Sequence, residues 1–245
     1  MATKKKPRCQ CIKSCKNPPL KSSAFCRQHR FCERRSPLTG YEPKYNPELY
    51  NKKKGKKEAL NCFAYAFDYQ KLPKSCTENE CSEPFPQPGR ASGHSQWSNE
   101  KGKRCPDLVG RLLGDIPTLK LSTFTKKCPN RYSKIAVVVD EDEDYHFYRQ
   151  DSNGYWSHKP GSTDVTRLDG YGRRIYDPQL ASRYYKKSGL NYDQFCTYLC
   201  APKDKLLKFS NGGSNKTHRA SKVSKSKTSK SKASKSKSKA KTKKR

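Results

Sequence analysis

Residues 144–161, DYHFYRQDSNGYWSHKPG, predict a β-hairpin that carries two histidines. The first arm alternates its side chains around His146, the second arm ends near His158, and Ser-Asn-Gly between the arms favours a tight turn. A two-residue loop at 153–154 would place the two histidines on opposite faces of the hairpin. A three-residue loop at 152–154, with its glycine in the left-handed conformation, would place them on one face. That second register is the one that suits a general base and a residue that orients it.

Composition and charge divide the chain into three parts. The 245 residues contain 54 Lys and Arg against 22 Asp and Glu, a formal net charge of +32. Residues 211–245 are rich in Ser and Lys and have almost no apolar surface to offset the entropy of ordering, so we expect a disordered tail. Residues 1–40 form a basic segment rich in Cys and His, and residues 41–210 are the expected main domain.

No signal peptide is expected, because the basic start MATKKKPRCQC lacks the apolar run that should follow it. The apolar run at 135–139 is too short to span a membrane. We therefore expect an intracellular protein. The twelve cysteines would then be mostly reduced, some ligating metal or reacting, with disulfides an alternative in an extracellular particle.

Six potential metal ligands lie close together near the start of the chain: Cys9, Cys11, Cys15, Cys26, His29 and Cys32. Two short pairs separated by a loop, Cys11 with Cys15 and Cys26 with His29, have the spacing that tetrahedral zinc needs. We predict a zinc knuckle with these four ligands, in which Cys9 or Cys32 could replace one. A structural zinc would supply folding energy to this small segment. The alternative is a disordered basic arm with incidental cysteines.

Residues 57–70, KEALNCFAYAFDYQ, have apolar side chains at helical spacing and predict a buried helix. Cys62 lies in its first turns. It is either a small core residue or a thiolate nucleophile favoured by the helix start and a nearby histidine. The acidic run 140–144 would bias His146 toward its charged form and so favour a thiolate–imidazolium pair.

The rest of the main domain predicts an α+β fold with a small antiparallel sheet. The patterns favour an amphipathic helix at 105–116, a buried strand at 135–139, a helix at 179–187 and a last strand at 191–200.

Cys62, His146 and His158 together fit the chemistry of cysteine hydrolases. Cys62 would attack a carbonyl carbon, His146 would take the thiol proton and return it to the leaving group, and His158 would hold the His146 ring. A lower-ranked alternative is that the same three side chains hold a catalytic zinc with water as the fourth ligand.

These motifs resemble the NlpC-type branch of papain-like cysteine peptidases. The resemblance rests on the spacing His146-x11-His158, on the strand at 135–139 that precedes it, and on NCFAYA around Cys62. It implies a helix packed on a small antiparallel sheet and a peptidase or amidase with Cys62 as nucleophile, His146 as base and His158 as orienter. The long interval between Cys62 and His146 departs from that branch, as does the missing glycine-rich lead into the strand.

The fuller pattern NCFAYA, DYHFYRQD, WSHKPG and FCTYLC is similar to uncharacterised proteins of bacteria and large DNA viruses. This resemblance implies that, if the source is viral, the protein is found in the virion, the host nucleus or the host cytoplasm.

The tail at 214–245 predicts a nucleic-acid partner. Its alternating Ser and Lys spread positive charge along a flexible chain, which suits phosphate neutralisation without reading of bases. A nuclear-localisation signal and simple solubilisation are competing interpretations. For the whole chain, the alternative to an enzyme is a non-enzymatic nucleic-acid-binding or virion structural protein on a degenerate hydrolase scaffold.

Overall fold

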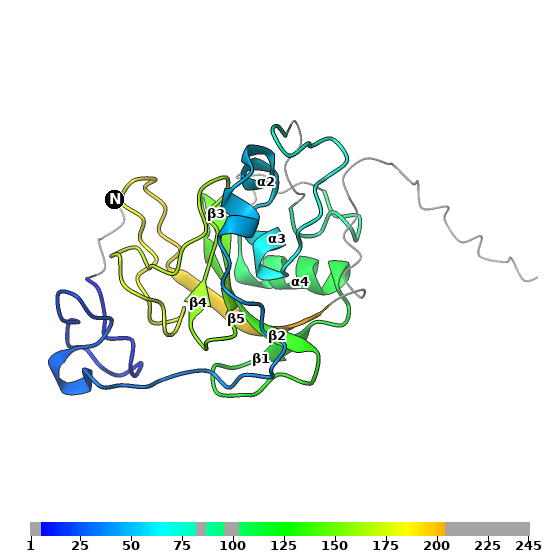
Figure 1. Ribbon diagram of the computed structural model, residues 1–245. Coiled ribbons are helices and arrows are strands. Elements are labelled where there is room, and N and C mark those ends of the chain that lie inside the picture. The colour runs from blue at the N-terminus through cyan, green and yellow to red at the C-terminus, as the bar shows by residue number, and fades with distance from the viewer. Residues whose placement is uncertain (1–5, 82–86, 96–102, 204–245) are drawn as a thin grey trace, which may run out of the picture. The chain divides into compact units, whose positions relative to one another are not determined.

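The computed structural model describes residues 6–81, 87–95 and 103–203 of the chain, so the predicted tail lies outside the described residues. The elements are the 3-10 helix η1 (Arg27–His29), the helices α1 (Glu48–Asn51), α2 (Lys54–Ala59), α3 (Cys62–Ala66) and α4 (Cys105–Asp115), and the strands β1 (Lys120–Ser122), β2 (Tyr132–Asp140), β3 (Asp144–Gln150), β4 (Trp156–Ser157) and β5 (Gln194–Pro202). This is a small α+β protein, as predicted (Figure 1). Within the described ranges, no helix is both long and apolar enough to cross a bilayer.

All strands belong to one antiparallel sheet in the order β1-β5-β2-β3-β4. Strand β2 lies between β3 and β5, so that Val137 pairs with Phe147 on one side and with Thr197 on the other. The predicted strand at 135–139 is confirmed as the buried middle of β2, and most of the predicted strand at 191–200 is confirmed as β5.

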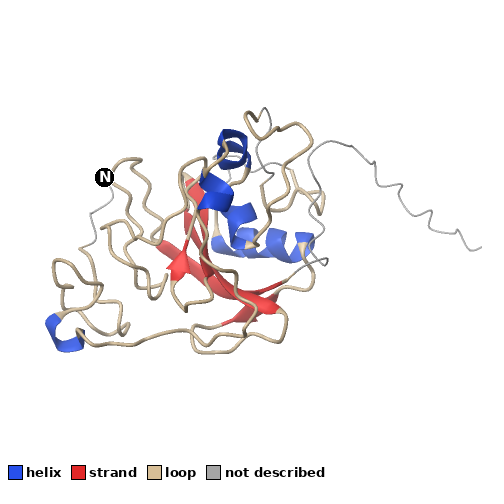
Figure 2. Ribbon diagram, in the orientation of Figure 1, coloured by secondary structure: helices blue, strands red, loops and turns tan. Residues whose placement is uncertain are grey.

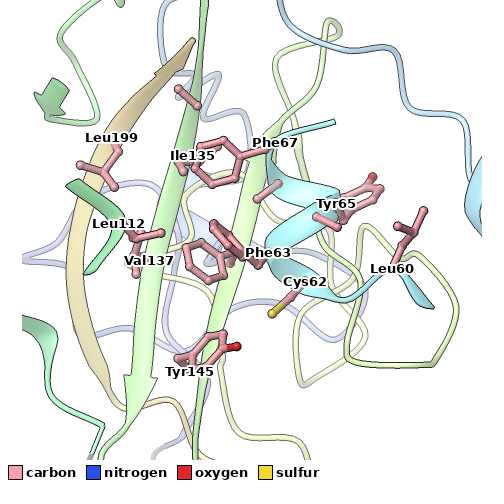
Figure 3. Packing of buried hydrophobic residues seen from close by; sticks show 14 of the residues in the cluster. Leu60, Cys62, Phe63, Tyr65, Phe67, Leu112, Ile135, Val137, Tyr145 and Leu199 are labelled. Atoms are coloured by element: carbon pink, nitrogen blue, oxygen red, sulfur yellow. The ribbon is translucent and has the colours of Figure 1, made fainter. Parts of the chain in front are cut away.

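Helices α3 and α4 cover one face of the sheet. Phe63 of α3 packs on Phe147 with ring centroids 5.4 Å apart, and Leu112 of α4 joins the same buried cluster as Val137 and Leu199 (Figure 3). Removal of this apolar surface from water is the main source of stability at this face. The amphipathic helix predicted at 105–116 is confirmed as α4.

Loops, rather than helices, cover the other face (Figure 2). Val138 and Tyr148 of the sheet pack there against Ala181 from the long connection between β4 and β5. The helix predicted at 179–187 is wrong. The Arg183 guanidinium donates to backbone carbonyls of this connection at distances of 2.6–2.8 Å, and these tertiary bonds replace helical ones.

The single helix predicted at 57–70 is two short helices, α2 and α3. Leu60 leaves the helical conformation, with φ −96° and ψ 106°, and Asn61 is also extended. The Asn61 side chain then accepts a hydrogen bond of 3.1 Å from the N–H of Ala64, which is the interaction that favours Asn at a helix start. Cys62 consequently becomes the first residue of α3.

Eight cysteines form four disulfides: Cys11–Cys32, Cys76–Cys81, Cys105–Cys196 and Cys128–Cys200. The expectation of mostly reduced cysteines is therefore wrong. Oxidation of these cysteines depends on which pairs the fold brings together, which their spacing in the sequence does not reveal. Four cysteines are free: Cys9, Cys15, Cys26 and Cys62.

Candidate functional site

The hairpin has the three-residue loop that places both histidines on one face. The N–H of Asp151 donates to the carbonyl of Tyr155 over 2.8 Å, and the N–H of Gly154 donates to the carbonyl of Asp151 over 2.8 Å. Gly154 has φ +82°, in the left-handed region that glycine adopts without strain. The predicted register is confirmed.

The two imidazoles are joined by a hydrogen bond of 2.8 Å between His146 Nε2 and His158 Nδ1. His158 Nε2 lies 3.0 Å from the carbonyl oxygen of Leu168, which can only accept, so that nitrogen carries a proton. In a neutral His158 ring Nδ1 must then be the acceptor, and His146 Nε2 the donor. The network leaves His146 Nδ1 unprotonated and able to accept a proton.

Burial keeps both rings neutral. His146 is 2% exposed and His158 is 0% exposed. Burial holds the pKa of His146 well below its usual range, and the neighbouring His158 lowers it further. Burial also lowers the pKa of His158 to about 4, although the Leu168 carbonyl opposes this shift. The expected charged form of His146 is therefore contradicted, because loss of water outweighs the acidic run.

A pocket of about 420 Å³ borders His146. The Tyr192 ring stacks on the His146 ring with centroids 5.2 Å apart, and its hydroxyl donates a bond of 2.8 Å to Asp144 Oδ2. Tyr185 and Thr163 form other parts of the lining. Tyr192 was not predicted as a site residue, because it lies in the long connection before β5, far along the chain from His146.

Cys62 is buried at the start of α3, beside Phe63 and Tyr145 (Figure 3). Burial raises the pKa of its thiol, and the negative charge of Asp144 raises it further, while the backbone N–H of Phe147 opposes the shift. The thiol is therefore protonated, and it lies against the main chain of the residue that follows His146.

The structure brings the two histidines together, but it does not join Cys62 to them. Successive side chains of β3 point to opposite faces. Phe147 lies in the same buried cluster as Cys62, whereas the His146 ring contacts Tyr148 and Tyr192. Across the described residues, no hydrogen bond links the Cys62 sulfur to either imidazole, so the expected contact between Cys62 and His146 is not formed in this conformation.

A second site lies near the start of the chain and could hold a metal ion. Its four ligand atoms, from Cys9, Cys15, Cys26 and His29, lie within 4.8 Å of one another. The sulfurs of Cys9 and Cys26 are 3.5 Å and 3.3 Å from His29 Nδ1. Three thiols and one imidazole are a complete tetrahedral set.

This group corrects one predicted ligand. Cys11 is bonded to Cys32, so Cys9 takes its place. A backbone hydrogen bond of 2.9 Å from Gln10 to Ala24 brings Cys9 beside the second ligand pair, a contact that the spacing alone does not reveal.

Comparison with known proteins finds a relative that matches half of the chain. No protein-family model matches the sequence. No solved structure matches it. Insoluble matrix shell protein 1 of Ruditapes philippinarum is 38% identical over 124 residues, which cover 50% of this chain and 70% of that protein. The chain belongs to the family of this shell protein. The match to insoluble matrix shell protein 1 leaves the other half of this chain unaligned.

Proposed function

We propose that the chain is a cysteine hydrolase that cleaves a peptide or amide bond, on a papain-like scaffold of the NlpC type. The observation that carries this proposal is the hydrogen bond of 2.8 Å between His146 Nε2 and His158 Nδ1. Because the Leu168 carbonyl holds His158, the pair has the arrangement of a general base and its orienting residue.

In this mechanism His146 Nδ1 accepts the proton of the Cys62 thiol. Both groups are neutral at rest, so the proton leaves as the sulfur attacks the carbonyl carbon, not before. The imidazolium then protonates the leaving amine, a thioester remains on the sulfur, and water hydrolyses it to restore the thiol. Cys62 has to turn toward the imidazole for the attack, since its thiol lies against the backbone of Phe147.

Acylation by a small activated ester tests this function. Intact-protein and peptide mass spectrometry should find the acyl group on Cys62. His146→Ala should slow the acylation about 10²–10⁴-fold, the usual contribution of a general base. The control is His94→Ala, which removes an exposed histidine. Equal acylation rates in wild type and His146→Ala would rule out the proposed base.

The second candidate is a non-enzymatic structural protein. It is favoured by the name of the relative, which describes a protein of the insoluble shell matrix, and by the four disulfides. Such bonds are typical of proteins that persist in an oxidising environment, which favours a virion or an extracellular matrix over the cytosol. A chain that is folded by circular dichroism but is not acylated at Cys62 would support this candidate.

We propose zinc as the metal of the Cys9, Cys15, Cys26 and His29 group, in a structural role. Thiolate and imidazole ligands in a closed tetrahedral set suit zinc better than magnesium or calcium, which prefer oxygen ligands. Elemental analysis should find one zinc per chain, and Cys26→Ser should remove it.

We propose that residues 214–245 bind nucleic acid without sequence preference. The support is their twelve Lys and two Arg with no acidic residue. Truncation after Gly213 should remove most DNA affinity and flatten its dependence on salt. Unchanged binding would place the nucleic-acid site elsewhere.

A further inference from the structure

Gln10 is a fully buried polar side chain that lies next to a ligand of the metal group. Its Nε2 donates to Asp169 Oδ2 at 3.3 Å and to the carbonyl of Arg174 at 3.2 Å. Its Oε1 accepts from the N–H of Tyr176 at 2.9 Å and from that of Asp177 at 3.4 Å. Every donor and acceptor of the amide group is engaged by one loop of the main domain.

Asp169 is the organising residue of that loop. Its carboxylate also accepts the backbone N–H groups of Tyr171, Arg173 and Ser182, at 2.9–3.1 Å. A buried carboxylate that fixes three backbone groups restricts the loop to one conformation. Gln10 Nε2 donates a further hydrogen bond to this carboxylate from outside the loop.

The same loop holds the histidine pair. Leu168, the residue before Asp169, supplies the carbonyl that lies 3.0 Å from His158 Nε2. His158 and Thr166 are also joined by two backbone hydrogen bonds of 2.9 Å. The position of the loop therefore sets the position of the His158 ring, and through the 2.8 Å bond that of His146.

Metal binding would fix the N-terminal segment from which Gln10 reaches this loop. The ligands come from three parts of the segment, Cys9, Cys15 and the single turn that holds Cys26 and His29, so one ion would close the whole segment around Cys9. The Gln10 backbone is tied to Ala24 of the same segment. The segment also contacts the loop directly, through Arg173 Nε to the Ser23 carbonyl at 3.0 Å and through the rings of Phe25 and Tyr176, so metal would tighten an interface that already exists.

We infer that Gln10 is a positioning residue through which metal loading of the Cys9 group orders the loop at 166–176 and fixes the His158–His146 pair. The path from the metal group to the histidine pair runs through two buried side chains, Gln10 and Asp169, and through the backbone carbonyl of Leu168. This regulation concerns the site that carries the proposed hydrolase function. The histidine geometry can nevertheless be measured without any assay of catalysis.

The test follows the full-length protein as zinc is added after chelation, by hydrogen exchange and by nitrogen NMR of the imidazoles. In wild type, zinc should slow exchange at the His158 and Thr166 amides on the order of tenfold, as expected when local opening is suppressed. The imidazole signals of the hydrogen-bonded pair should sharpen over the same titration. In Gln10→Ala, zinc should still bind with unchanged stoichiometry, but these effects should be lost.

Gln28→Ala is the matched control. Gln28 lies next to the ligand His29 as Gln10 lies next to Cys9, but its side chain accepts only an exposed bond of 2.8 Å from Asn17. This variant should respond to zinc as wild type does. If Gln10→Ala does not fold, the wild-type titration decides alone.

Zinc binding that leaves exchange and imidazole signals of wild type unchanged would overturn the inference, as would a full response in Gln10→Ala. Neither result depends on acylation of Cys62. A negative result for the effect of zinc through Gln10 is therefore distinguishable from a negative result for the proposed hydrolase.

Discussion

His146 Nε2 and His158 Nδ1 lie 2.8 Å apart, in a part of the protein from which water is almost completely excluded. Each ring nitrogen of His158 is engaged, one by His146 and the other by the carbonyl of Leu168. This network requires a neutral His158, because a second proton on that ring would place two donors face to face, and burial keeps His146 neutral as well.

The pair should therefore make the protein less stable in acid. In the folded state the pKa of both histidines is lowered, to about 4 for His158, so between about pH 6.5 and pH 4 the unfolded chain binds more protons. The free energy of unfolding should fall as the pH falls through this range. For His158 the loss should reach about 3 kcal/mol. Denaturant unfolding at several pH values measures it.

Buried carboxylates also contribute to the pH dependence of the free energy of unfolding. Burial raises the pKa of Asp144 and Asp169, so their contribution changes in the opposite direction. A His146→Gln, His158→Asn double variant keeps these carboxylates and isolates the histidines. Its stability should depend less steeply on pH than that of wild type; equal slopes would contradict the neutral pair.

Cys9, rather than Cys11, should be required for metal binding. Cys9 contributes its sulfur to the four-ligand group, whereas Cys11 is bonded to Cys32. Cys9→Ser should lower the bound metal to well below one ion per chain. The Cys11→Ser, Cys32→Ser double variant should keep one ion. Inductively coupled plasma mass spectrometry of dialysed protein distinguishes the two ligand sets, and the opposite result would restore the set predicted from spacing.

The disulfides should differ in their contribution to stability. Cys105–Cys196 joins α4 to β5 across a sequence separation of 91, whereas Cys76–Cys81 has a separation of 5. A longer closed loop removes more entropy from the unfolded chain, about 4–5 kcal/mol against about 2 kcal/mol. Replacing each pair by Ala and measuring unfolding in urea compares them. A larger loss for the short loop would show that this entropy does not dominate.

The parts of the fold that follow from local patterns could be predicted from the sequence. The hairpin register depends on a three-residue turn with Gly154, and the central position of β2 depends on a short run of buried apolar residues. Both are set by residues within a few positions of one another. The shared face of His146 and His158 followed from them.

The parts that depend on distant contacts could not be predicted. Asn61 interrupts an apolar helical pattern because its side chain caps α3, so the predicted helix was too long. Spacing cannot distinguish Cys9 from Cys11 until the disulfide to Cys32 is known. The turn and the alternation along the hairpin placed the histidines on one face, but only the packing of α3 reveals that the Cys62 thiol lies against the backbone of Phe147.

Substitution of Arg149 should lower the free energy of unfolding more than most substitutions on the face of the sheet that the helices cover. It is 1% exposed, and its guanidinium bonds Asp151 Oδ1 at 3.2 Å and Asp68 Oδ1 at 3.0 Å. Asp151 is 0% exposed, so Arg149→Met would leave a buried carboxylate without its cation. Breaking a buried pair in this way costs about 3–5 kcal/mol.

Two further variants separate the lost pairing of Arg149 from lost packing. Arg149→Met with Asp151→Asn removes both charges and should recover part of the lost stability, because no uncompensated buried charge remains. Lys203→Met removes the partly exposed partner of Asp68, 3.0 Å away, and should cost less than about 1 kcal/mol. Urea denaturation of the three variants measures these differences. If Arg149→Met costs no more than Lys203→Met, the buried pair does not stabilise the contact between α3 and β3.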